Sequence, residues 1–180
     1  MHQVIGVSGV LQLKYHYKMA KRIITKIGDV FCVEVGTEYK CYFQYVANDK
    51  TVLNSSVIRV FKTKYPMDYE PILNDIIKDD VFFYAHTILH FGISFNAWYR
   101  VGKHNEVGNI EDIWFRWFDD VDYSNKTKSF TWSIWKINQE PIFVGGLDCK
   151  YSNYDLGVVF SYDNIVNKIA KGVFLLKSVD

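Results

Sequence analysis

The chain has 180 residues, a length typical of one domain, and its 21 Lys and Arg nearly balance its 20 Asp and Glu. Because each phosphate contact needs a cation, this balance argues against nucleic acid as a partner, although a nucleic-acid-binding β module stays open as an alternative. No apolar run approaches the roughly 20 residues that cross a bilayer. The 3 cysteines show neither metal nor disulfide spacing. We therefore expect a cytoplasmic protein with no membrane contact.

The N-terminal residues differ from the rest of the chain. Met1–Leu13 is mildly apolar, but the basic residues follow it rather than precede it, which is the wrong order for a secretory signal. Met19 offers an alternative start. We predict that residues 1–18 are a dispensable extension and that residues 19–180 form a single globular domain, since that range contains no linker or repeat.

The first part of this domain has the period-two pattern of β-strands. Val30–Val35 places three apolar residues on one face, and large side chains alternate along Tyr39–Val46. A turn at Gly36 separates the two segments, so we predict that they pair as an antiparallel hairpin. A third strand is predicted over Val57–Lys62.

Two segments have apolar residues three and four positions apart, which indicates helix. Pro71 suits the first turn of a short helix over residues 71–79. The second helix is expected over residues 162–171, with Ser161 or Asp163 as its N-cap and Gly172 just after its last turn.

The other expected strands are rich in β-branched and aromatic residues. They are Val81–Leu89, its neighbour Ile93–Val101, Ile113–Phe118, Thr131–Ile137 and a closing Val173–Leu176. Several antiparallel strands with two short helices predict an α+β domain that is mainly antiparallel β.

His86 and His90 have the spacing with which one helix face can bind a metal. In the expected strand the two side chains instead lie roughly 13 Å apart, at about 3.3 Å per residue, which is too far to share an ion. With His104 they define one alternative, a metal-dependent hydrolase. Since the sequence lacks a nucleophile elbow, a P-loop and a dinucleotide fingerprint, we expect no catalysis, no cofactor and no bound metal.

The most unusual local feature is a tryptophan-rich strand with acidic residues at both ends. One interpretation is a buried strand whose ends are solvated. The other is a recognition surface in which aromatic anchors are rimmed by negative charge, as suits a basic protein partner. The predicted partner-binding residues are Glu111, Asp112, Trp114, Trp117, Asp119, Asp120 and Asp122.

Lys26–Val35, followed by Tyr39–Val46, resembles the opening strands of small SH3-like barrels, and in particular the immunity protein 26 family of bacterial polymorphic-toxin systems. The G-D-V-F motif from Gly28 to Phe31 carries the resemblance, which covers residues 21–62. It implies SH3-like N-terminal strands and an intracellular immunity protein that neutralises a cognate toxin by direct binding. A nuclease toxin has a basic site for phosphates, which suits the acidic residues above.

Overall fold

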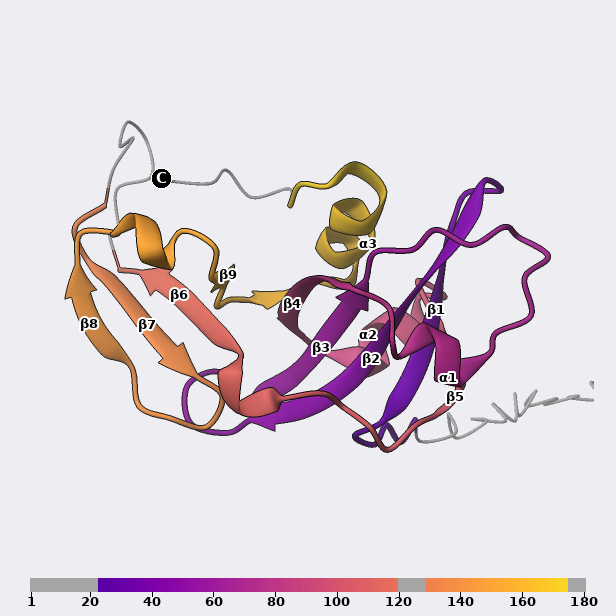
Figure 1. The fold of residues 1–180 in the computed structure, drawn as a ribbon, viewed down its shortest axis with the longest axis horizontal. Coiled ribbons are helices and arrows are strands. Elements are labelled where there is room, and N and C mark those ends of the chain that lie inside the picture. Colours follow the sequence, from indigo (N-terminus) through magenta and orange to yellow (C-terminus); the bar gives the residue numbers. More distant parts are fainter. Residues whose placement is uncertain (1–22, 120–128, 175–180) are drawn as a thin grey trace, which may run out of the picture.

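The structure, a computed structural model, describes residues 23–119 and 129–174, which form two β-sheets and three α-helices (Figure 1). The larger sheet contains β1 (Asp29–Val35), β2 (Tyr39–Asp49), β3 (Ser55–Phe61), β4 (Val81–Thr87), β5 (Tyr99–Lys103) and β10 (Val159–Phe160). The smaller sheet contains β6 (Trp114–Phe118), β7 (Trp132–Lys136), β8 (Ile142–Gly145) and β9 (Asp155–Leu156). The helices are α1 (Leu73–Ile76), α2 (Leu89–Ser94) and α3 (Tyr162–Lys171), with short 3-10 turns at Ile110–Asp112 and Cys149–Tyr151.

The strand order is β10-β4-β3-β2-β1-β5 in the larger sheet and β8-β7-β6-β9 in the smaller one. Each sheet combines antiparallel pairs with one parallel pair, which is β10 with β4 in the first and β6 with β9 in the second. The predicted α+β class and its mainly antiparallel β character are confirmed. Within the described residues neither sheet closes into a barrel, and no helix is long and apolar enough to span a membrane.

The predicted hairpin is confirmed, since β1 and β2 pair antiparallel with Val35 opposite Tyr39. Gly28 precedes β1 with a φ of +96°, and a Cβ atom there would lie 2.6 Å from the carbonyl oxygen of His104. The glycine of the G-D-V-F motif is therefore required by a close backbone contact with the segment after β5.

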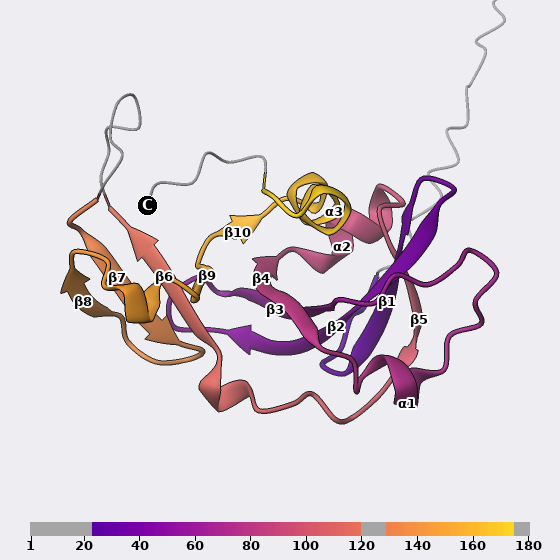
Figure 2. The ribbon, with the colours of Figure 1, turned by 45° about the horizontal axis from the view of Figure 1, so that its top comes forward.

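Both faces of the larger sheet are covered. The side chains of Cys41, Phe43 and Tyr45 pack with α2 and α3 on one face. Those of Tyr42 and Val46 pack on the other face, the first with α1 and the second with the smaller sheet. Figure 2 shows α2 and α3 on one side of the sheet and α1 on the other. The alternation in β2 therefore separates two buried faces rather than a buried face from a solvated one.

Helix α3 matches its prediction in position and in capping. The Ser161 hydroxyl accepts a hydrogen bond from the Asn164 N–H, and Gly172 has a left-handed φ of +76° after the last turn. Ile165 and Ile169 are buried in the core. This helix forms where its local sequence signals place it.

Helix α1 is shorter than the predicted segment 71–79, because only Leu73–Ile76 are helical. Ile76 and Ile77 are buried against the larger sheet, whereas Ile72 is 55% exposed. Pro71 lies before the helix rather than in its first turn.

The predicted strands over residues 81–89 and 93–101 are partly wrong. The first ends at Thr87, and helix α2 occupies residues that were expected to extend it or pair with it. Gly92 lets this helix pack directly on Trp98, because a Cβ atom at this position would lie 2.0 Å from the indole ring. The Trp98 Nε1–H also donates to the carbonyl oxygen of Leu89 at 3.1 Å. The chain becomes a strand again only at Tyr99, and this strand, β5, pairs with β1 rather than with β4.

The predicted closing strand is not formed by its described residues. Val173 and Phe174 lie outside the strands, and residues 175 and 176 fall outside the described ranges. The Phe174 ring instead stacks on the Phe160 ring, with their centroids 3.7 Å apart. This contact continues the apolar core between α3 and the larger sheet.

Candidate protein-binding surface

The three histidines of the hydrolase alternative lie in different surroundings. His86 is fully buried, with its Nε2 atom 3.1 Å from Asp49 Oδ2. His104 Nε2 lies 3.0 Å from Asn74 Oδ1, and His90 is exposed on α2. Among residues 23–119 and 129–174, no group of three or more His, Cys, Asp or Glu side chains is placed to hold a metal ion.

His86 belongs to a buried polar network around Asp49, whose carboxylate is fully shielded from solvent. The carboxylate accepts hydrogen bonds from Trp135 Nε1 at 3.0 Å and from the backbone N–H of Asn138 at 3.2 Å. Burial raises the pKa of Asp49, but the hydrogen bonds from Trp135 and His86 outweigh it and hold that pKa below its ordinary value. Burial lowers the pKa of His86, so the neutral imidazole donates from Nε2 to the carboxylate. This network joins β2, β4 and the smaller sheet.

The predicted acidic residues divide between the two ends of β6. Glu111 and Asp112 lie in the 3-10 turn before the strand, and Asp119 follows its last residue. The Lys136 ammonium lies 3.3 Å from Asp112 Oδ1, so it partly neutralises the acidic residues before β6. The five residues of β6 separate the ends by roughly 16 Å at 3.3 Å per residue. Asp120 and Asp122 lie outside the described residues.

The two predicted tryptophans lie on opposite faces of the smaller sheet, three positions apart on β6. The Trp114 ring stacks on Tyr154 with centroids 5.3 Å apart, and the Lys136 ammonium lies 5.0 Å from its centroid. Trp117 shares the other face with Phe115, which packs toward the larger sheet. The structure therefore does not bring Trp114 and Trp117 into one patch.

Other large apolar side chains of the smaller sheet and its flanks are exposed. Phe130 is 72% exposed, Phe143 69% and Ile142 54%. Phe130 adjoins Thr131, whose hydroxyl accepts the Asp119 N–H at 3.1 Å. Figure 1 shows the last residues of β6, the start of β7 and the end of β8 at one corner of the smaller sheet. Ile142 pairs with Ile134 and points to the opposite face of the smaller sheet from its neighbour Phe143. We name Asp119, Phe130 and Phe143 the distal surface.

The distal surface includes the outer strand of the smaller sheet. In the part of the chain that the structure describes, β8 pairs with β7 alone, through Ser133 opposite Phe143 and Ile134 opposite Ile142. An edge strand presents unpaired backbone groups beside its side chains. Apolar side chains along such an edge are suited to contact with another chain.

The sequence analysis did not identify Phe130, Ile142 and Phe143. Phe130 follows a polar connection, and β8 is only four residues long. The available signal was Pro141 followed by I-F-V-G, a short apolar run bounded by turn residues, which is typical of an edge strand.

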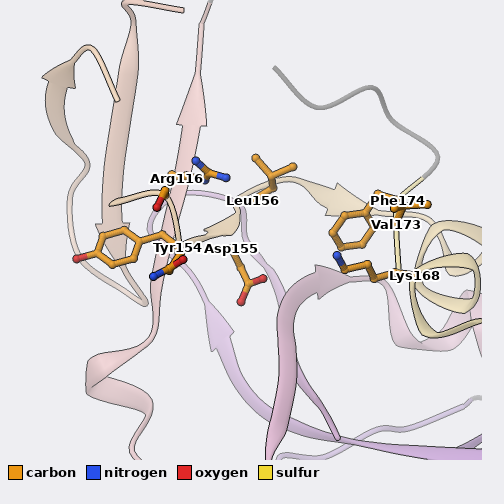
Figure 3. Close-up of a pocket in the computed structure, with 9 residues that line it drawn as sticks. Arg116, Tyr154, Asp155, Leu156, Lys168, Val173 and Phe174 are labelled. Carbon is orange, nitrogen blue, oxygen red and sulfur yellow. The ribbon is translucent and has the colours of Figure 1, made fainter. Parts of the chain in front are cut away.

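A cavity of about 300 Å³ lies beside β9 and α3, with Arg116, Asp155 and Lys168 among its lining residues (Figure 3). Asp155 Oδ2 accepts the backbone N–H of Tyr84 at 2.8 Å, which links β9 of the smaller sheet to β4 of the larger one. Burial raises the pKa of Asp155 to about 6, although the cations of Lys168 and Arg116 oppose this shift. The carboxyl group therefore changes its protonation near neutral pH at a contact between the sheets.

The distal surface has the composition of a protein interface, with exposed aromatic rings beside a carboxylate. The buried polar groups described above serve contacts within the fold instead. Comparisons of this chain with models of known protein families, with curated proteins and with solved structures find no match.

Proposed function

We propose that this chain is a non-enzymatic protein-binding domain and that the distal surface contacts its partner. The observation that carries the proposal is the exposure of Phe130, at 72%, and of Phe143, at 69%, in the smaller sheet and its edge strand. Burying a side chain of this kind contributes about 1.5–3 kcal/mol, so a partner that covers both rings gains substantial affinity.

The charge near this surface favours a basic partner. Asp119 and Glu140 are exposed close to the aromatic side chains, and Asp120 and Asp122 continue the acidic run in the sequence. Carboxylates at the rim of an interface accelerate encounter with a basic surface and disfavour acidic competitors. The predicted acids on this side of β6 thus keep their proposed role, with Phe130 and Phe143 as additional anchors.

The resemblance of residues 21–62 to the immunity protein 26 family makes a bacterial toxin the proposed partner. The order β4-β3-β2-β1-β5, in which the fifth strand returns to pair with the first, supports the SH3-like part of that resemblance. On this proposal the chain acts in the cytoplasm and blocks a cognate toxin, such as a nuclease whose active site carries Lys and Arg for phosphates.

The test is a growth assay with the product of the gene that adjoins the gene for this chain, which the proposal expects to be a toxin. Cells that express the toxin should stop growing, and co-expression of this chain should restore growth. The double variant Phe130→Ser/Phe143→Ser should lose this protection. Ile72→Ser, which removes another exposed apolar side chain far from the distal surface, should retain it.

The outcomes separate the two parts of the proposal. Growth arrest that this chain does not relieve would contradict the immunity function. Full protection by the double variant, at the same expression level, would contradict the assignment of the distal surface and leave the protective function standing.

A further inference from the structure

A second feature of the surface is a cleft of about 440 Å³ between the end of β3, the start of β4 and the last turn of α3. Phe61, Phe82 and Ile169 line it together with Lys62, Lys64 and Lys171, and the Lys64 ammonium lies 4.3 Å from the centroid of the Tyr39 ring. We name these six lining residues the lysine-rimmed cleft. The cleft is independent of the distal surface, because it belongs to the larger sheet and shares no residue with it.

The floor of the lysine-rimmed cleft is apolar. Phe61 and Ile169 are buried in the core, and Phe82 is 41% exposed, so its ring is open to a ligand. Cys41 also lines the cleft, and burial raises the pKa of its thiol to about 11 despite the opposing charge of Lys64. This thiol is therefore protonated at neutral pH, and the floor carries no charge of its own.

The rim is positively charged by residues from two distant parts of the sequence. Lys62 and Lys64 follow β3, whereas Lys171 comes from the last turn of α3. Lys62 Nζ lies 3.5 Å from Asp80 Oδ2, but both side chains are more than half exposed, so this pair neutralises the rim only weakly. Asp79 is the other nearby acid, and its Oδ2 accepts the backbone N–H of Thr63. A fourth cation is close, since Lys168 Nζ lies 5.7 Å from the Phe82 ring centroid and donates to the carbonyl oxygen of Gly172. Four cations thus stand against two carboxylates around an apolar floor.

We propose that the lysine-rimmed cleft binds a small amphipathic anion, an alkyl or aryl group that carries one carboxylate or phosphate. The apolar part would cover Phe82 and the floor, where each Å² removed from water contributes about 25 cal/mol. The anionic head would lie among the lysine ammoniums, which act as flexible point charges for carboxylates and phosphates. The cleft has the size of a small-molecule site, which begins at about 300 Å³.

The test is a calorimetric titration of the full chain with octanoate, 1-octanol and octylammonium, which share one alkyl chain and differ in charge. Octanoate should bind at one saturable site, and at least about tenfold more tightly than octanol, which corresponds to 1.4 kcal/mol. Octylammonium should not bind. Raising the salt concentration should weaken the binding of octanoate.

Variants locate the site. Lys64→Gln/Lys171→Gln should weaken octanoate binding at least about fivefold, and Phe82→Ser should weaken both octanoate and octanol. Lys78→Gln removes an exposed charge outside the cleft and should bind octanoate like the unmodified chain. Octanol or octylammonium binding as tightly as octanoate would overturn the proposal. So would unchanged affinity in a folded double variant, or an equal loss in Lys78→Gln.

Discussion

The buried carboxylate of Asp49 receives hydrogen bonds from both sheets, through His86 on β4 and Trp135 on β7. Asp49→Ala should lower the free energy of unfolding by about 3 kcal/mol, because it leaves buried donors without an acceptor. The exposed control Asp68→Ala should change it by less than about 0.5 kcal/mol. Urea denaturation at pH 7 measures both values, and equal stability of the two variants would contradict the role of the network.

The contribution of Asp155 to the stability of the folded state depends on pH, and its raised pKa sets the direction of that dependence. Because its folded pKa of about 6 lies above the ordinary 3.8, the folded state binds more protons between these values and loses stability as pH rises through 6. Asp155→Asn mimics the protonated form, so it should be more stable than the parent at pH 7.5, by at most about 3 kcal/mol, and this difference should fall to at most about 1 kcal/mol at pH 4.5. Denaturation at the two pH values checks this, and a variant that is less stable at pH 7.5 would refute it.

These residue-level roles were only partly predictable from the sequence. Asp49 is the last residue of β2, and two of its hydrogen-bond partners lie 37 and 86 positions away in the sequence. No local pattern specifies contacts that arise when two sheets pack together. For the same reason, His86 suggested metal chemistry, whereas the fold buries it beside a carboxylate.

At the scale of elements, helices α2 and α3 show where sequence patterns suffice and where they do not. The limits of α3 follow from its cap residues Ser161 and Gly172 and from its apolar spacing, all of which are local. Helix α2 has β-branched and aromatic residues that favour strand, and it depends on a contact between Gly92 and Trp98. Tertiary packing therefore overrides propensity in α2.

The packing of α2 on Trp98 predicts that two glycine substitutions lower the free energy of unfolding by different amounts. Gly92→Ala should destabilise the protein by about 3 kcal/mol, because the new methyl group overlaps the Trp98 ring. Gly36→Ala should cost only about 1 kcal/mol, because Gly36 has a positive φ but no atom within 4 Å of the added Cβ. Thermal unfolding ranks the variants, and a Gly92→Ala protein as stable as Gly36→Ala would contradict the packing of α2.

At the scale of the whole molecule, the hairpin of β1 and β2 and the α+β class were predictable, because period-two alternation is a local property. The division into two sheets was not, since the parallel pairings of β9 and β10 join segments distant in sequence. The surface assignment changed as well, because alternation along β6 places Trp114 and Trp117 on opposite faces, while β8 adds Phe143.

The dispensability of residues 1–18 stays a prediction. Their deletion should lower the melting temperature by no more than a few degrees, because a loss of 1 kcal/mol shifts a domain of this size by about 2–4 °C. A larger decrease, measured by differential scanning calorimetry on the full and shortened chains, would show that these residues stabilise the fold.

The central claim is that the distal surface binds a basic protein partner, with aromatic anchors and carboxylates in separate roles. Binding kinetics with the cognate toxin, at low and high salt, test it most directly. Neutralising Asp119, Asp120 and Asp122 together should slow association at low salt and flatten its salt dependence, with little effect on dissociation. Phe130→Ser/Phe143→Ser should instead accelerate dissociation at least about tenfold. Unchanged rates in both variants would contradict the claim and exclude the distal surface as the contact.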